Sequence, residues 1–393
     1  MRLHLIFFIF FFSVGDIISQ VSILSDDEWF KIGVVESGVY KLDKNFFDEN
    51  NISLEGISPD KIKIYGTGYN GSLPQLNSQS EIIGPQQIQS LFSGNQDSKF
   101  SDNEFLYFYL QSSDKIYFDS LENNLKVEKN IYTDTAYYFI HIGGEARTLV
   151  HVENNPNAYN REDVSAFHTF NYENDMYSII QSGREWYGEI FSPGESFSIP
   201  FDNFISNTDL KLEINLISRS TVPSSFDFYL NNNLVSDVDM DLVKDNLYGN
   251  KVLKKKKIIE SKFELSSSNS LELKYNGVNS AISYLDNINI TGRVELRYNG
   301  SQFHFYILPE YENIITKYKI KSSKIFGEDL DGNLNLRTWD ISYLYNVKSM
   351  DVNRDGDDYF FINDDSIFSR KILFDIDNLS YPFYEKKIQN SDI

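Results

Sequence analysis

The chain has 393 residues, of which 41% are hydrophobic and 15% aromatic, so it carries too much apolar surface for a disordered protein and enough for two or three domains. Its 57 acidic residues against 36 basic ones give a net charge of −21, which repels nucleic-acid phosphates and argues against a nucleic-acid partner. Cysteine is absent, which excludes disulfides, thiolate metal sites and a cysteine nucleophile.

Residues 1–20 have the features of a signal peptide. Arg2 supplies a positive charge, and the apolar run at 5–14 is too short to span a bilayer comfortably. Asp16 ends that run, and a small residue, Ser19, offers a cleavage point. An uncleaved anchor is the alternative. No other stretch reaches transmembrane length, so we expect an exported protein with no transmembrane span in its mature part.

The segment 21–155 is predicted to form an N-terminal β domain. Residues 28–34 alternate polar and apolar side chains, and a turn at 36–38 leads into 39–42, which together predict a β-hairpin. Asp43 is a suitable N-cap for a short helix that contains Phe46 and Phe47.

A strand predicted at 61–65 runs into Gly66-Thr67-Gly68-Tyr69-Asn70-Gly71, formally the glycine pattern of a dinucleotide site. Such a site needs a helix to follow, but Pro74 and a polar stretch oppose one. The glycines therefore predict a tight loop rather than a nucleotide site.

Two aromatic runs at 105–110 and 135–140 are predicted as buried strands, with an amphipathic connection at 114–119 between them. The polar stretch 152–160, which contains Pro156, predicts a domain boundary near residue 155.

The segment 156–300 is predicted to form a second β domain. Its expected strands are short and separated by polar turns, at 196–200, 210–217, 225–230, 257–265, 271–275 and 284–291. This spacing favours a two-sheet sandwich, and its last strands look like those of galactose-binding-like jelly rolls. The basic run Lys254 to Lys257 is interpreted as a solvated strand edge or loop. The chain is thus predicted to be mostly β, with successive sandwich or jelly-roll-like domains and few short helices.

The segment 301–393 is predicted to be β-rich, with strands at 303–307, 334–339 and 359–362. It also holds a weak calcium-loop candidate, because oxygen-bearing side chains recur around Gly356 at Asp351, Asn353, Asp355 and Asp357. The twelfth position of that loop is Ile362, which lacks the usual carboxylate, so an ordinary acidic turn is the favoured interpretation. Calcium is the one cofactor that stays a candidate, and no catalytic residue could be assigned.

The stretch 181–191 concentrates unusual residues: Arg184, Glu185, Trp186, Tyr187, Gly188 and Glu189. It is interpreted as a folded turn that anchors a tryptophan at the entry of the second domain, with an ion pair from Arg184 to Glu185 or Glu189. The three tryptophans, Trp29, Trp186 and Trp339, could stack on sugars, but packing in cores or between domains is the favoured role.

Several of these blocks together carry a family resemblance. The stretch 181–191, the Trp29 and Tyr40 region, the strand around Asp286, and Trp339-Asp340 resemble the amino-terminal region of the gingipain-like sortases of the type IX secretion system, the PorU family. The resemblance runs in short blocks from about residue 28 to the end of the chain.

That resemblance implies a role. Enzymes of the family are cysteine peptidases that remove carboxy-terminal sorting domains from secreted cargo at the outer membrane, and they work with an outer-membrane β-barrel shuttle protein. This sequence has no cysteine, and its histidines, at positions 4, 141, 151, 168 and 304, match no catalytic position of the family. The resemblance therefore implies the non-catalytic amino-terminal portion of a sortase, exported and held at the cell surface.

Two other functions stay open. A freestanding exported carbohydrate- or surface-binding β module belongs to a different class and would use the second domain. An intact hydrolase is the weaker possibility, because no nucleophile could be assigned from the sequence.

Overall fold

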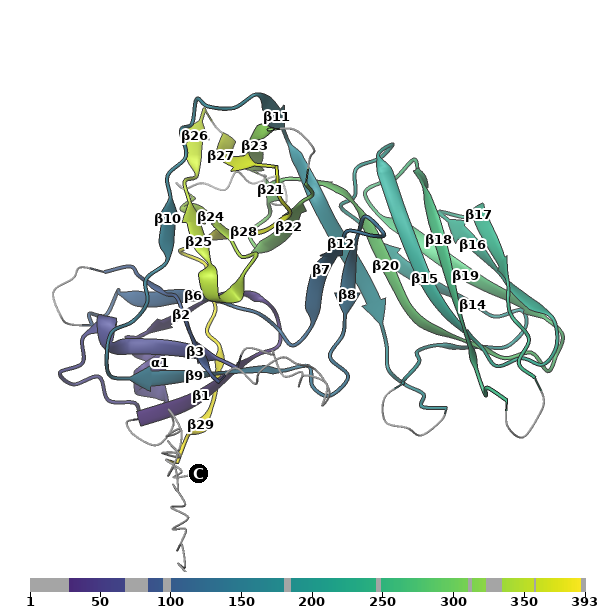
Figure 1. Ribbon diagram of the computed structural model, residues 1–393, viewed down its shortest axis with the longest axis horizontal. Helices are drawn as coiled ribbons and strands as arrows, with labels where there is room; N and C mark the ends of the chain where they lie inside the picture. The colour runs from purple at the N-terminus through teal and green to yellow at the C-terminus, as the bar shows by residue number, and fades with distance from the viewer. Residues whose placement is uncertain are drawn as a thin grey trace, which may run out of the picture.

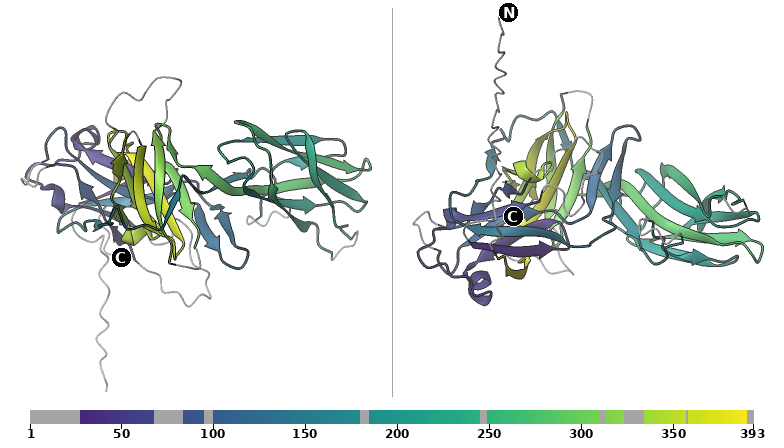
Figure 2. Two further views of the ribbon diagram at one scale, coloured as in Figure 1. Left: turned by 90° about the horizontal axis from the view of Figure 1, so that it is seen from above. Right: turned by 60° about the horizontal axis from the view of Figure 1, so that its bottom comes forward.

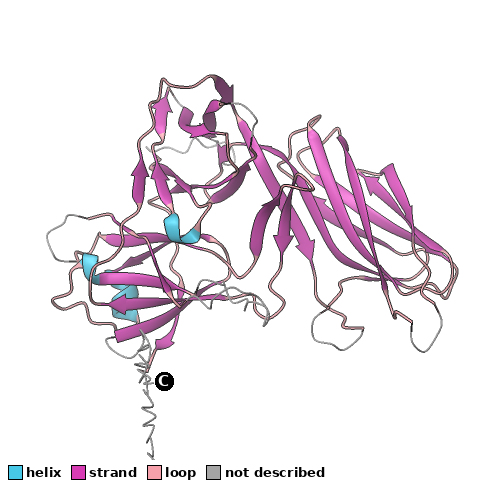
Figure 3. Ribbon diagram, in the orientation of Figure 1, coloured by secondary structure: helices cyan, strands magenta, loops and turns pink. Residues whose placement is uncertain are grey.

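The structure is a computed structural model that describes residues 28–67, 84–94, 100–179, 185–244, 249–309, 313–322, 334–356 and 358–389. Figures 1 and 3 show three blocks of strands with few short helices. The predicted fold class, a mostly β protein built from successive sandwiches, is confirmed. The predicted signal peptide lies outside the described residues, as does most of the glycine loop that follows β3.

The first block consists of two facing sheets. One has five strands in the order β29 (Phe383–Lys387), β1 (Glu28–Val34), β9 (Ala136–Ile142), β3 (Ile62–Gly66) and β4 (Gln86–Ile88). The other has three strands in the order β2 (Gly38–Asp43), β6 (Phe105–Leu110) and β5 (Leu91–Phe92). Their inner faces share one apolar core, which includes Ile32, Leu42, Phe47, Phe108 and Ile140.

The predicted hairpin between 28–34 and 39–42 is wrong. Strand β1 pairs with β9 and β29, whereas β2 pairs with β6 in the opposite sheet. The short link therefore crosses from one sheet to the other, so that Val34 and Leu42 face the same core from opposite sides. A hairpin would have placed both strands in a single layer, without an opposing sheet to cover them.

Asp43 caps the helix as predicted. Its carboxylate accepts a hydrogen bond of 3.0 Å from the backbone N–H of Phe46, at the start of α1 (Lys44–Glu49). Phe46 and Phe47 are buried. The other two helices described are single 3₁₀ turns, η1 (Pro59–Lys61) and η2 (Leu344–Asn346).

A single ten-stranded sheet runs through the other two blocks. Its main path is β10 (Val150–Val152), β25 (Lys348–Met350), β24 (Leu336–Asp340), β28 (Ser369–Asp375), β22 (Phe303–Ile307), β12 (Ser165–Glu173), β20 (Ser283–Glu295), β15 (Asp209–Ser218) and β18 (Leu253–Lys262). The short strand β13 (Ile190–Phe191) pairs with β20 beside this path. In Figure 1, the sheet can be traced across the molecule from β10 to β18.

One end of this sheet is covered by a four-stranded sheet, which completes the second sandwich. That sheet runs in the order β14 (Ser196–Phe201), β19 (Asn269–Gly277), β16 (Ser224–Leu230) and β17 (Asn233–Asp239). Leucine, isoleucine and phenylalanine side chains from both sheets fill the space between them. Figure 2 shows this sandwich extending to one side of the other blocks, to which long strands connect it.

The other end of the sheet is covered on both faces. A third sheet, β11 (Arg161–Asp163), β23 (Ile315–Ser322), β27 (Asp358–Asp364) and β26 (Asn353–Asp355), with β21 (Arg297–Tyr298) attached, shares a core with β22 and β28. A separate core joins β24 and β28 to Val39, Tyr107 and Tyr109 of the first block. The first and last segments of the chain are therefore packed together, and β29 hydrogen-bonds to β1.

The segment 114–119 is a strand rather than a connection. Strand β7 (Lys115–Asp119) pairs with β8 (Asn124–Glu128) in a hairpin that lies against the ten-stranded sheet. Lys126 of this hairpin forms an ion pair of 2.5 Å with Glu213. The amide of Asn289 donates to the Leu125 carbonyl at 2.8 Å. Backbone pairing and side-chain contacts thus connect the predicted segments, whose limits at 155 and 300 stay predictions.

Candidate functional site

The predicted motif folds around a backbone bridge between Tyr177 and Tyr187. The Tyr177 N–H donates to the Tyr187 carbonyl at 2.8 Å, and the Tyr187 N–H donates back at 2.9 Å. Next to it, the N–H of Gly188 donates to the Leu285 carbonyl at 2.7 Å. A Cβ at position 188 would lie 2.8 Å from the Asn174 carbonyl oxygen. Glycine therefore permits a close approach of three backbone segments.

Glu185 forms an ion pair with a lysine that the sequence analysis did not connect to it, and the predicted pair with Arg184 is untested. Arg184 lies outside the described residues, and the carboxylate of Glu185 pairs with Lys254 at 2.7 Å. The Tyr187 hydroxyl also donates to Glu185 at 2.8 Å. These two hydrogen bonds, the one from Lys254 first, lower the pKa of Glu185. The basic run on β18 is thus a strand edge whose first lysine completes this network.

Glu189 is held by neutral donors. It accepts hydrogen bonds from the Tyr172 hydroxyl and, at 3.3 Å, from the side-chain amide of Asn174. Burial, followed by the Glu189 carboxylate, raises the pKa of Tyr172 to about 12. Glu189 therefore connects the turn to strand β12 and its end by hydrogen bonds, and its predicted ion pair with Arg184 stays untested.

Asp286 occupies an irregularity in strand β20. Asn215 of β15 pairs with Asn287, whereas Leu216 pairs with Leu285, so Asp286 is the extra residue of a β-bulge. Bulges redirect a side chain out of the regular alternation. Burial raises the pKa of Asp286 to about 6, and the carboxylates of Asp175 and Glu185 add to this, while Lys254 opposes it.

Glu173, which the sequence analysis did not single out, lies beside Asp286. It is the last residue of β12 and pairs with Asn287 in the neighbouring strand. Burial raises its pKa to about 7, with further increases from Asp175, Asp286 and Asp114 and an opposing effect from Lys129. The signal in the sequence was the close spacing of two acids and two tyrosines within residues 172–177, directly before the motif.

The exposure of the tryptophans separates them into two groups. Trp29 and Trp339 are 2% and 0% exposed, so packing is the correct interpretation for both. Trp186 is 39% exposed, and packing is the wrong interpretation for it. Met176 and Tyr177, on the opposing segment of the bridge, are also exposed, at 45% and 41%. The buried anchor of the motif is Tyr187, whose ring lies 6.2 Å from that of Tyr284.

Trp29 and Tyr40 belong to the first block. The Trp29 ring lies 4.3 Å from the His141 ring and 5.1 Å from the Tyr65 ring, at the end of the five-stranded sheet. The Tyr40 hydroxyl donates to the Glu36 carbonyl at 2.7 Å, and burial raises its pKa to about 12. Both residues shape the first sandwich and do not join the Tyr187 bridge.

Trp339 and Asp340 connect the first block to the central sheet. The Trp339 ring stacks on Tyr107 at 5.4 Å and meets Phe374 edge-on at 5.0 Å. Asp340 pairs with the buried Lys371 at 2.8 Å. Burial alone would raise the pKa of Asp340, but Lys371 and Ser342 together keep it below its ordinary value. This pair is a structural ion pair within the sheet.

The calcium-loop candidate forms part of a hairpin. Asn353 and Asp355 lie on β26, and Gly356 turns the chain with φ of +67°. Asp355 pairs with Lys317 at 2.9 Å, and Asp351 pairs with His151 at 3.0 Å. Asp357 lies outside the described residues. Among the residues that are described, no group of three or more acidic or histidine side chains is arranged to hold a metal ion. A calcium site here stays an untested prediction.

His151 also approaches a serine, which the sequence did not reveal. Its Nδ1 lies 3.0 Å from the Ser349 hydroxyl while its Nε2 faces Asp351, so a serine, a histidine and an aspartate are in hydrogen-bond contact. His151 and Ser349 are register partners on the paired strands β10 and β25. The histidine is half exposed at the edge of the sheet, and the two hollows described below include none of the three residues. We interpret the contact as a cross-strand pair rather than a catalytic triad, which also needs an oxyanion site.

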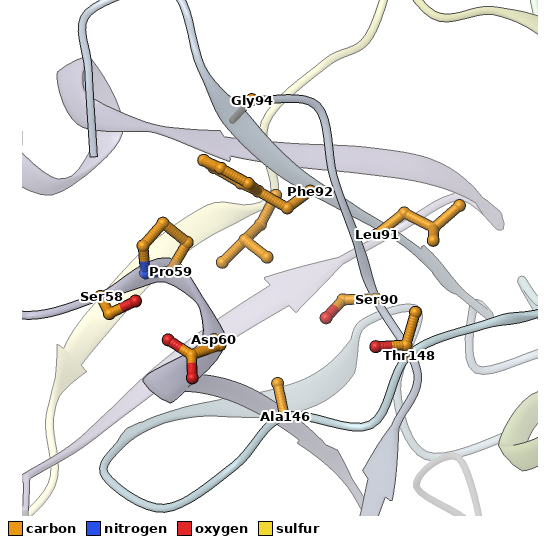
Figure 4. A pocket seen from close by; sticks show the side chains of 10 residues that line it. Ser58, Pro59, Asp60, Ser90, Leu91, Phe92, Gly94, Ala146 and Thr148 are labelled. Carbon is orange, nitrogen blue, oxygen red and sulfur yellow. The ribbon is translucent and has the colours of Figure 1, made fainter. Parts of the chain in front are cut away.

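Two hollows of the described structure could hold a small ligand. The first, of about 430 Å³, lies in the first block, and Figure 4 shows the Asp60 carboxylate and the Ser90 and Thr148 hydroxyls around its opening, with Phe92 beside them. Hydrogen bonds, the first from Ser58, lower the pKa of Asp60. The second, of about 440 Å³, lies at one end of the second sandwich and is lined by Asp239 and Asn276 among others. Each lining contains one carboxylate and no histidine, so neither offers an acid and base pair.

Comparisons with known proteins give one informative likeness. No protein-family model matches the sequence, and no curated protein matches it. Among solved structures, the dimeric latent PorU from Porphyromonas gingivalis is similar, with a TM-score of 0.77 and 18% identity over 95% of this chain. The chain has a PorU-like fold. It spans about a third, 34%, of the length of that PorU chain.

Two further solved structures show a more distant similarity. The CBM36-1 domain of a multidomain xylanase from the hindgut metagenome of Trinervitermes trinervoides has a TM-score of 0.23 and 12% identity, and it covers 32% of this chain and 95% of its own. A β-porphyranase from Bacteroides plebeius has a TM-score of 0.19 and 14% identity over 69% of this chain and 35% of its own. Within the described residues, no helix is long and apolar enough to cross a membrane.

Proposed function

We propose that this chain is the non-catalytic amino-terminal portion of a type IX secretion system sortase, where it serves as the scaffold for a peptidase domain. The observation that carries the proposal is the PorU-like fold over 95% of the chain, combined with a length of only 34% of that PorU chain. The absence of cysteine agrees with a scaffold role, because a cysteine peptidase needs a thiolate nucleophile.

The arrangement of the blocks suits a scaffold. Four apolar cores bind the sheets to one another, and one of them joins the first block to the central sheet through Val39 and Trp339. Strand β29 returns to pair with β1 in the first sheet. A peptidase domain that followed residue 393 would therefore be anchored next to the first block, on strands that are fixed by long-range pairing (Figure 1).

The partners and location follow from the same proposal. The chain would be exported by its signal peptide and held at the outer membrane, in contact with a β-barrel shuttle protein and with cargo that carries carboxy-terminal sorting domains. The resemblance of the sequence blocks to the sortase family supports these assignments. A net charge of −21 agrees with a role that involves no nucleic acid.

Two experiments test the proposal. Sequencing past codon 393 should find a continuing frame that encodes a histidine and a cysteine in a peptidase domain, and unrelated sequence there would count against the proposal. In the source cells, removal of the region encoding residues 28–389 from that frame should leave secreted proteins with their sorting domains uncleaved, as judged by mass spectrometry. Normal cleavage in that strain would contradict a scaffold role.

A specific observation favours a second candidate function. Trp186 is exposed at one end of the second sandwich, and exposed aromatic rings can stack on sugars. The chain could then be a freestanding carbohydrate-binding module. A glycan array with the whole chain and with Trp186→Ala distinguishes the two functions, because saturable sugar binding that is lost in the variant would favour the module.

A further inference from the structure

The surface around the Tyr187 bridge combines exposed apolar side chains with carboxylates. Met176, Tyr177 and Trp186 are all at least 39% exposed and lie within one residue of the paired residues of the bridge. We call these three side chains the bridge patch. Large exposed apolar groups are common one at a time, whereas several that lie near one another are typical of sites of interaction.

Among the described residues, the carboxylates beside the bridge patch outnumber the cations. After burial, the carboxylates of Asp175 and Asp286 raise the pKa of Glu173, and those of Asp175 and Glu185 raise the pKa of Asp286. Lys129 pairs with Asp175 at 3.5 Å, and Lys254 pairs with Glu185 at 2.7 Å. In the part of the chain that the structure describes, Glu173 and Asp286 form no ion pair. Among these residues, two carboxylates of this surface therefore share nearby lysines with other acids and have no ion-pair partner of their own.

Such an arrangement is costly for the isolated chain. Burial raises the pKa of Glu173 to about 7, and repulsion from the nearby carboxylates of Asp175 and Asp286 adds to this increase. A cation that a binding partner brings would offset this repulsion and would itself be attracted to the carboxylates. A metal ion is a poor candidate for that cation, because the described residues contain no group of three acidic or histidine side chains suitably placed.

We propose that this end of the second sandwich is a docking surface for a peptide segment that is both basic and apolar. A lysine or arginine of that segment would lie between Glu173 and Asp286, and a neighbouring apolar side chain would cover Trp186. Charge complementarity selects a peptide over a neutral glycan, which would leave the two carboxylates uncompensated. The inference does not depend on the proposed function, because the same surface would exist on a chain that is not a sortase scaffold.

Trp186 provides a direct readout. The chain has three tryptophans, and the other two, Trp29 and Trp339, are buried, so a change in the emission of an exposed indole reports on this surface. The probes are capped decapeptides of alternating lysine and leucine, of alternating glutamate and leucine, and of lysine alone. We expect the lysine and leucine peptide to shift the tryptophan emission to shorter wavelengths and to bind more tightly than either of the others.

Two variants test the charges. Glu173→Gln with Asp286→Asn removes both unpaired carboxylates and should weaken binding of the lysine and leucine peptide about tenfold at low salt. The matched control, Asp202→Asn with Glu260→Gln, removes two exposed carboxylates of the same sandwich. Because Phe204 pairs with Val294 at the opposite end of β20, this control lies away from the patch and should leave the affinity unchanged.

A third variant tests the role of Trp186, and a change of pH tests the charge of the two carboxylates. Trp186→Ala should weaken binding about threefold by calorimetry. Lowering the pH from about 8 to about 5 should weaken binding in the natural chain, because Glu173 and Asp286 take up protons while lysine stays charged. Other charged groups also face these two carboxylates. The pKa values of Glu173 and Asp286 are raised further by Asp114, Asp175 and Glu185, and they are lowered by Lys129 and Lys254.

Circular dichroism of each variant confirms that it is folded before binding is measured. Equal binding of the lysine and glutamate peptides would overturn the inference, as would an affinity unchanged by the Glu173 and Asp286 double variant. Binding of neutral oligosaccharides that competes with the peptide and survives the double variant would assign the surface to sugars instead. Downstream sequence without a peptidase domain would refute the proposed function but not this inference.

Discussion

The charged groups of the third sheet and those around the Tyr187 bridge differ in how they are paired. Asp365 is fully buried and accepts hydrogen bonds from Arg161 at 2.6 Å, Thr316 at 2.5 Å and Tyr318 at 3.0 Å. Its side chain also accepts one from Asn363 at 2.8 Å. Both oxygens of that carboxylate thus accept hydrogen bonds, three at one oxygen and one at the other, as a buried charge requires.

Around the bridge, the carboxylates are less buried and less paired. Burial and then nearby carboxylates raise the pKa of both Glu173 and Asp286, which among the described residues form no ion pair with a lysine or arginine. The contrast teaches that charge in the third sheet stabilises the fold, whereas charge at the bridge is held at a cost to the isolated chain. A cost of this kind is what sites of interaction typically carry.

The comparison is tested most severely by removing the buried carboxylate. Asp365→Ala should lower the free energy of unfolding by about 3–5 kcal/mol, because Arg161 and three neutral donors lose their acceptor. Urea unfolding measures the change. The neighbouring Asp364 is exposed and accepts one bond of 2.9 Å from the Ser366 N–H, so Asp364→Ala should cost about 1 kcal/mol or less. Equal losses in the two variants would remove the distinction between paired and exposed charge.

The tryptophans extend the same comparison to apolar groups. Trp339 is buried between Tyr107 and Phe374 in the core that joins the first block to the central sheet. Trp339→Ala should cost about 3–5 kcal/mol through the cavity that it leaves. Trp186→Ala should change the stability by about 0.5 kcal/mol at most, since its ring is exposed. A large loss for Trp186 would mean that the bridge patch is structural.

Substitution of the glycine next to the bridge should reduce the stability by a smaller amount. Gly188→Ala should cost about 1–3 kcal/mol, because its Cβ would lie 2.8 Å from the Asn174 carbonyl oxygen and 3.3 Å from that of Leu285. Gly84→Ala is the control, because nothing lies within 4 Å of a Cβ at that position. Thermal unfolding of both variants measures the difference, and similar melting temperatures would show that the close approach at Gly188 is readily relieved.

The sequence predicted local features well because local chemistry determines them. The cap by Asp43, the strand at 28–34 and the solvated basic edge at 254–257 all follow from short-range patterns. The choice of strand partners does not, because it is settled by burial across distant segments. The expected hairpin failed for this reason, and strand β29 was missed because its pairing partner lies more than 350 residues earlier, as the contact between Lys387 and Glu28 illustrates.

The site was predictable only in part. The motif at 185–189 was found from its composition, but the partner of Glu185 was not, since Lys254 follows 69 residues later on another strand. The position of Asp286 on a bulge depends on the register of two neighbouring strands. Glu173 joins the site through that same register. Sequence patterns identify which residues are unusual, whereas the register of the sheet decides which of them meet.

The smallest expected effect depends on pH. The pKa of Glu173 is raised from its ordinary value of 4.5 to about 7 in the folded chain, so the folded state binds this proton more tightly than the unfolded state does. Stability contributed by this group is therefore fully present below about pH 4.5 and is lost as the pH rises through about 7. Glutamine cannot ionise. Glu173→Gln should accordingly be more stable than the natural chain at about pH 8, by roughly 1 kcal/mol because the side chain is only partly buried.

That advantage should vanish near pH 4.5, where the natural glutamate is itself protonated in the folded state. Urea unfolding of both chains at several pH values measures the difference, and Asp202→Asn, at an exposed position of the same sandwich, serves as the control with no comparable trend. A difference that stays constant with pH would mean that Glu173 is not strained by its neighbours. The carboxylates at the bridge would then be as well compensated as those in the third sheet, and the reason to expect a basic partner there would disappear.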